Sequence, residues 1–476
     1  MNKKVLGVLA AVLATLMLPI SAFAAFSANL LDNPTYSYEN NGLTYLEQEL
    51  NEGGVQKLFY GEYDTTSADA EYEWVIHSIR DGSKTTLTNV MNIAKDYENT
   101  TGRKVMFATN GDYFDFGSGA NIESYVNDGI VVSKGAFAHK HCIGFDNQGK
   151  VVTGRMTEVE RRLVVVVDGQ RTFFEIDKYN EEPGENEIAI YTKPGTYNID
   201  GAAKYVCGTE SANLEQYPVW GTCRRMKANT LGDNDPFTLK SNQFAVVVKG
   251  ENAQFFCDNV TYDVEVDLVE IPAGQFAGCT WVLGGYDILV DNGTVNTDCH
   301  TDNSGNAKAP RTFIGFKEDG TGFLCVVDGR QSGYSVGITV NQEAQLAKVL
   351  GAQYALELDG GGSSTVIIRI DDVLTLRNKP SDGSMRNVSN AIMLVEKEKE
   401  APEQEQPGQN TENPPATDPT EPTKPSQPAT QPATQPTEPS ATGTFSGVTV
   451  IALATGAVVL VAAVVVVAVV LGKKRK

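Results

Sequence analysis

Hydrophobic residues in the central part of the chain occur in short runs or alternate with polar residues, and both patterns are typical of β-strands. Many of these runs end at Asp-Gly or Asn-Gly pairs, which favour tight turns between strands. The clearest runs cover residues 105–109, 129–133, 163–167, 187–191, 244–248, 312–316 and 323–327. The central region is therefore predicted to fold mainly as β-sheet.

Two other segments repeat their hydrophobic residues at helical spacing. The first covers about residues 86–97. The second begins after Thr339, which has the spacing of a capping box with Gln342, and ends at Gly351. One face of this helix would carry Val340, Ala344, Ala347 and Leu350. Many strands and two helices predict an α+β fold, a β-rich domain of mixed sheets with few helices.

Both ends of the chain carry long apolar runs. Residues 1–24 have two lysines, an apolar run and an Ala-Phe-Ala sequence, which is the pattern of a signal peptide. Residues 446–472 contain an almost unbroken run of Val, Ala, Leu and Ile, long enough to cross a hydrocarbon core of roughly 30 Å as a transmembrane helix. The basic residues 473–476 would then form a cytoplasmic tail. We therefore predict a single-pass protein of the cell membrane with its folded part outside the cell; association with the cell wall is the alternative.

The region between the two ends divides by composition. Residues 399–445 are rich in Pro, Thr, Gln and Glu, so they are predicted to form an extended stalk. No second linker interrupts the chain before them, and we predict an N-terminal extension at 25–71 followed by one domain at 72–398.

Charge and cysteine content limit the function and the fold. The whole chain has a net charge of -21; the signal peptide contributes +2, the stalk -5 and the tail +4, which leaves about -22 on the folded region. A surface this acidic argues against binding to nucleic acid. The seven cysteines show no CxxC pair and no zinc-type spacing with histidine, and no metal ligand set is predicted. Because an exported protein can form disulfides, two short-loop pairs, Cys207–Cys223 and Cys279–Cys299, are predicted, with the connectivity left open.

The sequence after the second helix suggests a binding site. Residues 354–359 have the alternation of a strand, in which Leu356 and Leu358 would face the core while Glu357 and Asp359 lie together on the other face. Residues 360–364, Gly-Gly-Gly-Ser-Ser, follow directly. Such a loop can turn successive N–H groups toward one anion, and phosphate is the expected ligand. The alternative is a tight connection between strands with a solvated pair of acids.

The segment Leu-Glu-Leu-Asp-Gly-Gly-Gly-Ser-Ser-Thr at 356–365 resembles the signature of the phosphodiester glycosidase family. Four more segments resemble motifs of that family in the same order, namely residues 110–115, 310–315, 328–337 and 378–390. The resemblance covers about residues 72–395. Where the family's glycine-loop motif usually reads Leu-Asn-Leu-Asp, this chain has Glu357 in the Asn position.

The resemblance implies a hydrolase that cleaves the bond between a sugar, expected to be an N-acetylhexosamine, and a phosphodiester on envelope or host glycans. The departing phosphate is a weak base, so such a reaction needs stabilised charge and an activated water more than a strong acid. Asp359, Asp112 and Glu357 are the catalytic candidates. The candidates for binding substrate or phosphate are Asn110, Gly111, Arg311, Asp328, Arg330, Gly360, Gly361, Gly362, Ser363, Ser364 and Arg386.

Several alternatives remain open at this level. Each of the three arginines could instead form a structural salt bridge, and Ser363 is expected to donate a hydrogen bond rather than act as a nucleophile, because no histidine is near it in sequence. No cofactor is required by the pattern; calcium is possible at residues 298–306, which are rich in Asp, Asn, Ser and Gly but lack the Glu of an EF-hand. The expected partners are a glycan or sugar-phosphate polymer and the membrane. The alternative function is a non-catalytic carbohydrate-binding or adhesive surface protein on the same fold.

Overall fold

The computed structural model describes residues 26–81, 84–135, 141–211, 213–226, 234–300 and 302–398, which all belong to one unit of the chain. The predicted signal peptide, stalk, transmembrane helix and basic tail lie outside these residues. Among the helices that are described, none is both long and apolar enough to cross a membrane.

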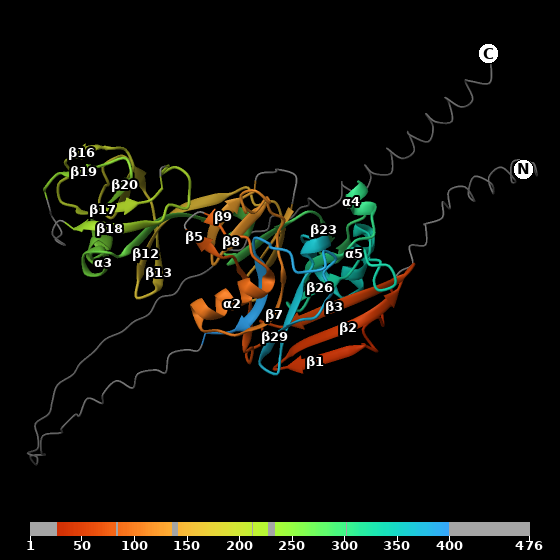
Figure 1. The fold of residues 1–476 in the computed structure, drawn as a ribbon. Coiled ribbons are helices and arrows are strands. Elements are labelled where there is room, and N and C mark those ends of the chain that lie inside the picture. Colours follow the sequence, from red (N-terminus) through yellow and green to blue (C-terminus); the bar gives the residue numbers. More distant parts are fainter. Residues whose placement is uncertain are drawn as a thin grey trace, which may run out of the picture. The chain divides into compact units, whose positions relative to one another are not determined.

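The sheet that carries the glycine loop has eight strands, and every neighbouring pair is antiparallel (Figure 1). Across the sheet the strands are β1 (Tyr36–Asn40), β2 (Leu43–Asn51), β3 (Val55–Tyr63), β26 (Gly322–Val327), β25 (Arg311–Lys317), β27 (Ala352–Glu357), β23 (Ile288–Asp291) and β24 (Thr294–Val295). Three of these strands come from the predicted N-terminal extension. The whole length of β26 pairs with the Leu58–Tyr63 part of β3. The extension therefore shares a sheet with the strands on either side of the site; the predicted boundary at residue 71 stays a prediction.

A five-stranded sheet packs against one face of this first sheet. Its strands in order are β29 (Val373–Leu376), β28 (Val366–Ile370), β7 (Val105–Asn110), β30 (Ala391–Glu396) and β4 (Tyr72–His77). Phe107, Ile314 and Leu356 meet in the apolar core between the two sheets. Gly61 permits this close approach, because a Cβ there would lie 2.6 Å from the Phe107 ring. The helix α5 (Val340–Val349) covers the other face of the eight-stranded sheet, where its Ala344 and Leu346 contact Phe313 and Phe323.

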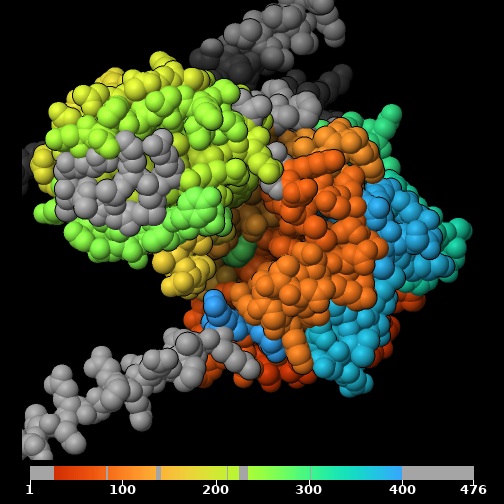
Figure 2. Space-filling model, turned by 60° about the vertical axis from the view of Figure 1, so that its left-hand side comes forward, coloured from red at the N-terminus to blue at the C-terminus, as the bar shows by residue number. Residues whose placement is uncertain are grey.

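The helix α2 (Val90–Thr101) contacts β7 and β30. In the space-filling view, orange surface from the part of the chain near residue 100 adjoins blue surface from the C-terminal part of the described chain (Figure 2). Two further large sheets are present among the described residues. One contains β11 (Val151–Gly154), β10 (His141–Phe145), β22 (Trp281–Gly285), β8 (Ser124–Asn127) and β9 (Ile130–Lys134). The other contains β13 (Gln170–Glu175), β12 (Val159–Val167), β21 (Glu265–Pro272), β18 (Gly221–Met226), β17 (Ala203–Thr209), β20 (Gln243–Val248), β15 (Ile188–Tyr191) and β14 (Lys178–Tyr179).

The last of these sheets has its own apolar core, to which the helix α3 (Glu251–Asn259) contributes Phe256. Its β14 and β15 are parallel, so the sheet is mixed as predicted. Two small hairpin-like pairs are β16 (Gly195–Tyr197) with β19 (Phe237–Leu239) and β5 (Arg80–Asp81) with β6 (Lys84–Thr85). The predicted β-rich α+β class with few helices is confirmed for the described residues.

All seven predicted strands are confirmed, as β7, β9, β12, β15, β20, β25 and β26. The capping box of Thr339 and Gln342 is also confirmed at the start of α5. The first helix was predicted too early, because the chain stays extended through Thr88, which bridges to Val388, and the helix begins only after its cap Asn89. The sequence pattern missed α3.

The two predicted disulfides are wrong for this structure, in which all seven cysteines are free and buried. Cys207 and Cys223 do lie opposite each other on β17 and β18, so the sequence placed them together correctly, but as two thiols. Cys279 packs beside Phe276, whereas Cys299 lies in the core next to α5. The short loop between Cys279 and Cys299 in sequence therefore does not bring their side chains together.

Candidate functional site

The glycine loop connects β27 to β28 and contains one short 3-10 turn, η2 (Gly361–Ser363). Leu356 and Leu358 before it are both fully buried in the core, as predicted from the alternation. The Asn110 side chain donates a 2.6 Å hydrogen bond to the Asp359 carbonyl, and the Asp359 amide donates to the Gly111 carbonyl at 3.1 Å. Two of the motifs, about 250 residues apart in sequence, are thus joined at the end of β7.

The amides of the loop do not form the open anion nest that the sequence suggested. Gly361 N–H donates to the Pro310 carbonyl at 2.9 Å, and the amides of Ser363 and Ser364 donate to carbonyls inside the loop. The Thr365 amide donates to the Asn110 side chain at 3.2 Å. Because these four donors are already paired within the protein, they cannot turn together toward one anion. The left-handed conformation expected at Gly361 is present, with φ +64°.

Two guanidinium groups lie against the glycines instead. A Cβ built on Gly361 would lie 2.8 Å from Arg330 Nη1, and one on Gly362 would lie 2.2 Å from Arg386 Nη2. Arg386 also donates to Asp382 at 2.9 Å and to the Ser363 hydroxyl at 3.3 Å. The exposed Arg330 guanidinium makes no hydrogen bond or ion pair to the rest of the described chain. The positive charge at the loop therefore comes from side chains that only glycine leaves room for.

Arg311, the third predicted arginine, has a different environment. It is 5% exposed, and its Nη1 donates to Glu357 Oε1 at 2.9 Å. Its other nitrogens donate to the backbone carbonyls of Ser304 at 2.8 Å, Ala307 at 3.2 Å and Ile338 at 3.3 Å. The guanidinium of Arg311 is thus engaged by the protein itself, which is the arrangement of a structural salt bridge.

Glu357 is 1% exposed at the end of β27. Its Oε1 also lies 3.5 Å from the Tyr113 hydroxyl, and its Oε2 lies 3.6 Å from His300 Nδ1. Burial raises the pKa of Glu357 to about 7, although the charges of Arg311 and His300 act against that rise. A carboxyl group with this pKa can give or take a proton near neutral pH.

Tyr113 marks the place where the two predicted acids come together. Burial, followed by the charges of Glu357 and Asp359, raises the pKa of the Tyr113 hydroxyl well above its usual value. Both carboxylates therefore act on one hydroxyl, as expected if they lie on the same side of the strand. Since the hydroxyl stays protonated, Tyr113 can serve as a neutral hydrogen-bond donor.

Asp112 and Asp328 lie in buried positions with different partners. Burial and then the charge of Glu123 raise the pKa of Asp112 well above its usual value, so its carboxyl group favours the protonated form. Asp328 accepts hydrogen bonds at 2.8 Å from both the Asn378 side chain and the Lys379 amide, and the Tyr334 hydroxyl donates to it at 3.2 Å. Asp328 thus connects the segment 378–390 to the end of β26 by hydrogen bonds. Because it is buried, its role is to hold this segment in place and not to contact a ligand.

The sequence reasoning missed His300, Asp287 and Glu343. His300 Nδ1 lies 2.7 Å from Asp287 Oδ2, and the His300 amide donates to the same oxygen at 2.6 Å. Burial opposes a charge on His300, but the hydrogen bond to Asp287 and the charge of Glu357 outweigh it and raise the His300 pKa. Glu343 on α5 is fully buried 4.0 Å from Arg311, and burial and then Glu357 raise its pKa well above its usual value. His300 falls within residues 298–306, so composition indicated the segment but not the residue.

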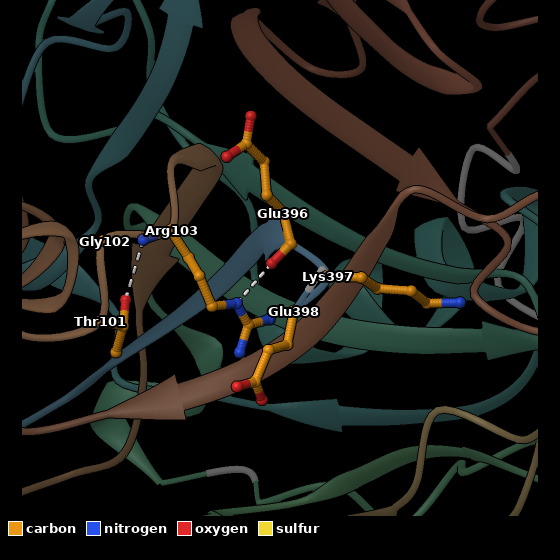
Figure 3. Close-up of a pocket in the computed structure, with 6 residues that line it drawn as sticks. All are labelled: Thr101, Gly102, Arg103, Glu396, Lys397 and Glu398. Carbon is orange, nitrogen blue, oxygen red and sulfur yellow. Dashed lines mark hydrogen bonds between the residues drawn. The ribbon is translucent and has the colours of Figure 1, made fainter. Parts of the chain in front are cut away.

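Part of the segment 298–306, where calcium was considered possible, is helical. Asp302 caps the short helix α4 (Asn303–Asn306) by accepting the amides of Ser304 at 2.8 Å and Gly305 at 2.9 Å. A separate cavity of about 470 Å³ lies where α2 ends, between Arg103 and Glu396, whose carbonyl accepts from Arg103 Nε at 2.6 Å (Figure 3). None of the predicted site residues lines this cavity.

The chain was compared with curated proteins, solved structures and protein-family models. None of the curated proteins compared with the chain matches it. Among solved structures, a hypothetical protein from Synechocystis is 17% identical with a TM-score of 0.46, and the match covers 77% of this chain and 64% of that one, which is less than two thirds of its length. A Burkholderia pseudomallei protein described as exported is 18% identical with a TM-score of 0.39, and the match covers 71% of this chain and 74% of that one.

A third solved structure is the catalytic domain of zebrafish N-acetylglucosamine-1-phosphodiester alpha-N-acetylglucosaminidase, auto-inhibited by its pro-peptide; it is 15% identical with a TM-score of 0.37, and the match covers 76% of this chain and 86% of that one. The sequence itself matches the model of the phosphodiester glycosidase family over residues 226–395, a range that includes the glycine loop, Arg330 and Arg386. Over these residues the resemblance to the phosphodiester glycosidase family is confirmed.

Proposed function

We propose that the chain is a membrane-anchored hydrolase that works outside the cell and cleaves the bond between a sugar and a phosphodiester. The observation that carries this proposal is the meeting of Arg330 and Arg386 at the glycine loop, directly after the strand that ends in Glu357. Two guanidinium groups beside a loop without side chains can grip one phosphate through several charge-assisted hydrogen bonds. The family match over the same residues supports this class of reaction.

Arg330 and Arg386 would bind different oxygens of the phosphate. Arg330 has no competing partner in the described chain, so its donors are available to the substrate. The Arg386 guanidinium is oriented by Asp382 at 2.8 Å, and its remaining N–H groups can bind a second oxygen of the phosphate. Both charges would stabilise the phosphate monoester as it departs, and the weak basicity of that group makes a strong general acid unnecessary.

Asp359 is the proposed group that activates water or stabilises the cationic sugar. Its backbone is fixed on both sides by Asn110 and Gly111, and its side chain is only partly buried. Glu357, with a pKa of about 7, would supply or accept a proton beside it, and the neutral Tyr113 hydroxyl would donate a hydrogen bond. If Asp359 proves dispensable, the role passes to Asp112 or Glu357.

The exposed ring of Phe116 offers a platform for the sugar. It is 70% exposed, packs against Phe114 with ring centroids 4.8 Å apart, and lies 5.7 Å from the Arg386 guanidinium. A single exposed aromatic ring next to a cationic group suits a ligand with an apolar ring face and an anionic end. A sugar phosphate has both features, and an N-acetylhexosamine is the sugar that the family resemblance favours.

The test is sugar release by the full chain, purified in detergent and incubated with a panel of sugar-1-phosphodiesters that includes N-acetylglucosamine-1-phospho-methyl-mannose. We expect release of free sugar from at least one donor, and a large loss of release in Arg330→Ala. Complete failure on a broad panel would overturn the proposal.

A non-catalytic carbohydrate-binding protein is the second candidate. The observation that favours it is the near-complete burial of Glu357, whose Oε1 is held by Arg311. Saturable binding of sugar phosphates without any release of sugar would select this function instead.

A further inference from the structure

We propose that Asp287, His300 and Glu357 bind one divalent transition-metal ion, with Zn²⁺ as the favoured ion. One carboxylate oxygen from each acid and one imidazole nitrogen lie within 4.8 Å of one another. One nitrogen and two oxygen ligands form a donor set that suits zinc better than calcium or magnesium, which prefer oxygen alone. The inference deepens the proposed function, because an ion here would lie beside the acids of that site.

The distances fit a coordination shell. His300 Nδ1 lies 2.7 Å from Asp287 Oδ2 and 3.6 Å from Glu357 Oε2. Ligand atoms at about 2.0–2.2 Å from a tetrahedral zinc ion are separated from one another by roughly 3.3–3.6 Å. The separation between His300 and Glu357 lies at the upper end of that range, and the shorter separation between His300 and Asp287 would have to widen by side-chain rotation.

The backbone holds the three ligands in place before any ion arrives. Glu357 N–H donates to the Asp287 carbonyl at 2.9 Å, and Tyr286 N–H donates to the Glu357 carbonyl at 3.1 Å, so the last residue of β27 lies beside the residue that directly precedes β23. His300 is fixed by its amide hydrogen bond to Asp287, and its ring packs on the Tyr286 ring with centroids 4.2 Å apart. Such restraint lowers the entropy that the ligands lose on binding.

A second, independent observation also indicates a ligand. Glu357 Oε2 is buried and has no hydrogen-bond partner in the described chain, and it lies 3.6 Å from His300 Nδ1. A buried carboxylate oxygen without a partner costs free energy, which a metal bond would recover. Both oxygens of the nearby buried Glu343 also lack hydrogen-bond partners among the described residues, so more than one buried carboxyl group here is left unsatisfied by the described chain.

The three ligands differ in exposure, and all three are largely buried. The side chain of Glu357 is 1% exposed, whereas those of Asp287 and His300 are 12% and 11% exposed. An ion could therefore enter from the histidine side and keep a coordination position for water or for a substrate oxygen, as catalytic zinc sites do.

The experiment measures zinc directly. The full chain in detergent is stripped with a chelator, equilibrated with Zn²⁺, dialysed and assayed for bound metal by plasma mass spectrometry, with the affinity from calorimetry. We expect one zinc per chain, and at least a 100-fold weaker affinity in both His300→Ala and Glu357→Gln. The control is His77→Ala, which removes a comparable histidine–aspartate pair, His77 with Asp96 at 2.9 Å, from a place without a third ligand.

Retention of one zinc by His300→Ala, or absence of stoichiometric zinc from the wild-type chain, would overturn the inference. Thermal unfolding of each chelated variant is measured as well, because a folded His300→Ala chain that binds no zinc separates loss of a ligand from loss of the fold. Sugar release is measured on the same samples. Zinc binding without release from any donor would refute the proposed function and leave the metal site, whereas release by a chain that binds no zinc would refute the metal site alone.

Discussion

The position of Gly362 permits a sharp test of the role of Arg386. A methyl group added at this residue would lie 2.2 Å from Arg386 Nη2 and 2.1 Å from Asp382 Oδ2, far inside van der Waals contact. Both atoms are the ends of flexible side chains, so the pair can move away and the backbone can stay. Gly362 does not have a positive φ, and Gly362→Ala should therefore fold.

The displaced guanidinium would no longer face the loop. One lost charge-assisted contact to a phosphate corresponds to about 1.5–3 kcal/mol, and since 1.4 kcal/mol is tenfold, the KM for a sugar-1-phosphodiester should rise about 10- to 100-fold. The assay is steady-state sugar release on the donor that the wild-type chain hydrolyses fastest. Thermal unfolding monitored on the same preparation checks that the fold is intact.

Gly383→Ala is the matched control. Gly383 lies in the same segment and has φ +82°, but no atom lies within 4 Å of a Cβ placed there. This change strains the backbone by about 1 kcal/mol and displaces no side chain, so it should lower stability and leave KM unchanged. An unaltered KM in a folded Gly362→Ala protein would show that Arg386 does not hold the substrate.

Three further predictions concern turnover, sugar binding and pH. Asp359→Asn keeps the shape of the side chain and removes its charge, so turnover should fall by about two orders of magnitude or more with little change in the unfolding temperature; near-full activity would exclude Asp359 as the catalytic group. Phe116→Ala should raise KM several-fold without loss of stability, because the ring is 70% exposed, and an unchanged KM would remove it from the sugar site. Burial raises the pKa of Asp328 from 3.8 to about 6, so the folded state holds this proton more tightly than the unfolded chain. Its contribution to stability is complete below about pH 4 and is lost as the pH rises through about 6, a change of roughly 3 kcal/mol. Urea unfolding at pH 4 and pH 7 measures it, and Asp328→Asn should remove this part of the pH dependence; the same slope in the variant would contradict it.

The local sequence pattern was sufficient to predict most of the strands, the start of α5 and the segment that contains the glycine loop. Alternating hydrophobic residues located the strands, the Thr339–Gln342 spacing located the start of α5, and the spacing of Leu356 and Leu358 gave the buried face of β27. These signals survive because each depends on neighbours within a few residues of the chain. The ordered motifs likewise indicated a resemblance to the phosphodiester glycosidase family, whose model matches residues 226–395.

The sequence pattern could not predict features that depend on contacts between residues far apart in the chain. The first helix starts at Val90 because Thr88 pairs with Val388, a contact that its own periodicity cannot encode. Arg311 and Arg386 have the same chemistry in sequence, but only the fold surrounds one with carbonyl groups and leaves the other beside a glycine. Free amides were expected in the loop, and the fold paired four of them.

For the acidic residues of the site, too, the sequence determined some features and the tertiary structure determined others. The sequence by itself determined that Glu357 and Asp359 stand before a glycine loop, because alternation and residue type are local properties. Only the tertiary structure brought His300 and Asp287 to Glu357, since the pairing of β23 with β27 decides which side chains become neighbours. Burial in the folded chain raises the pKa of Glu357 to about 7. The extent of burial depends on the residues that pack around a side chain, and these are brought together only by folding.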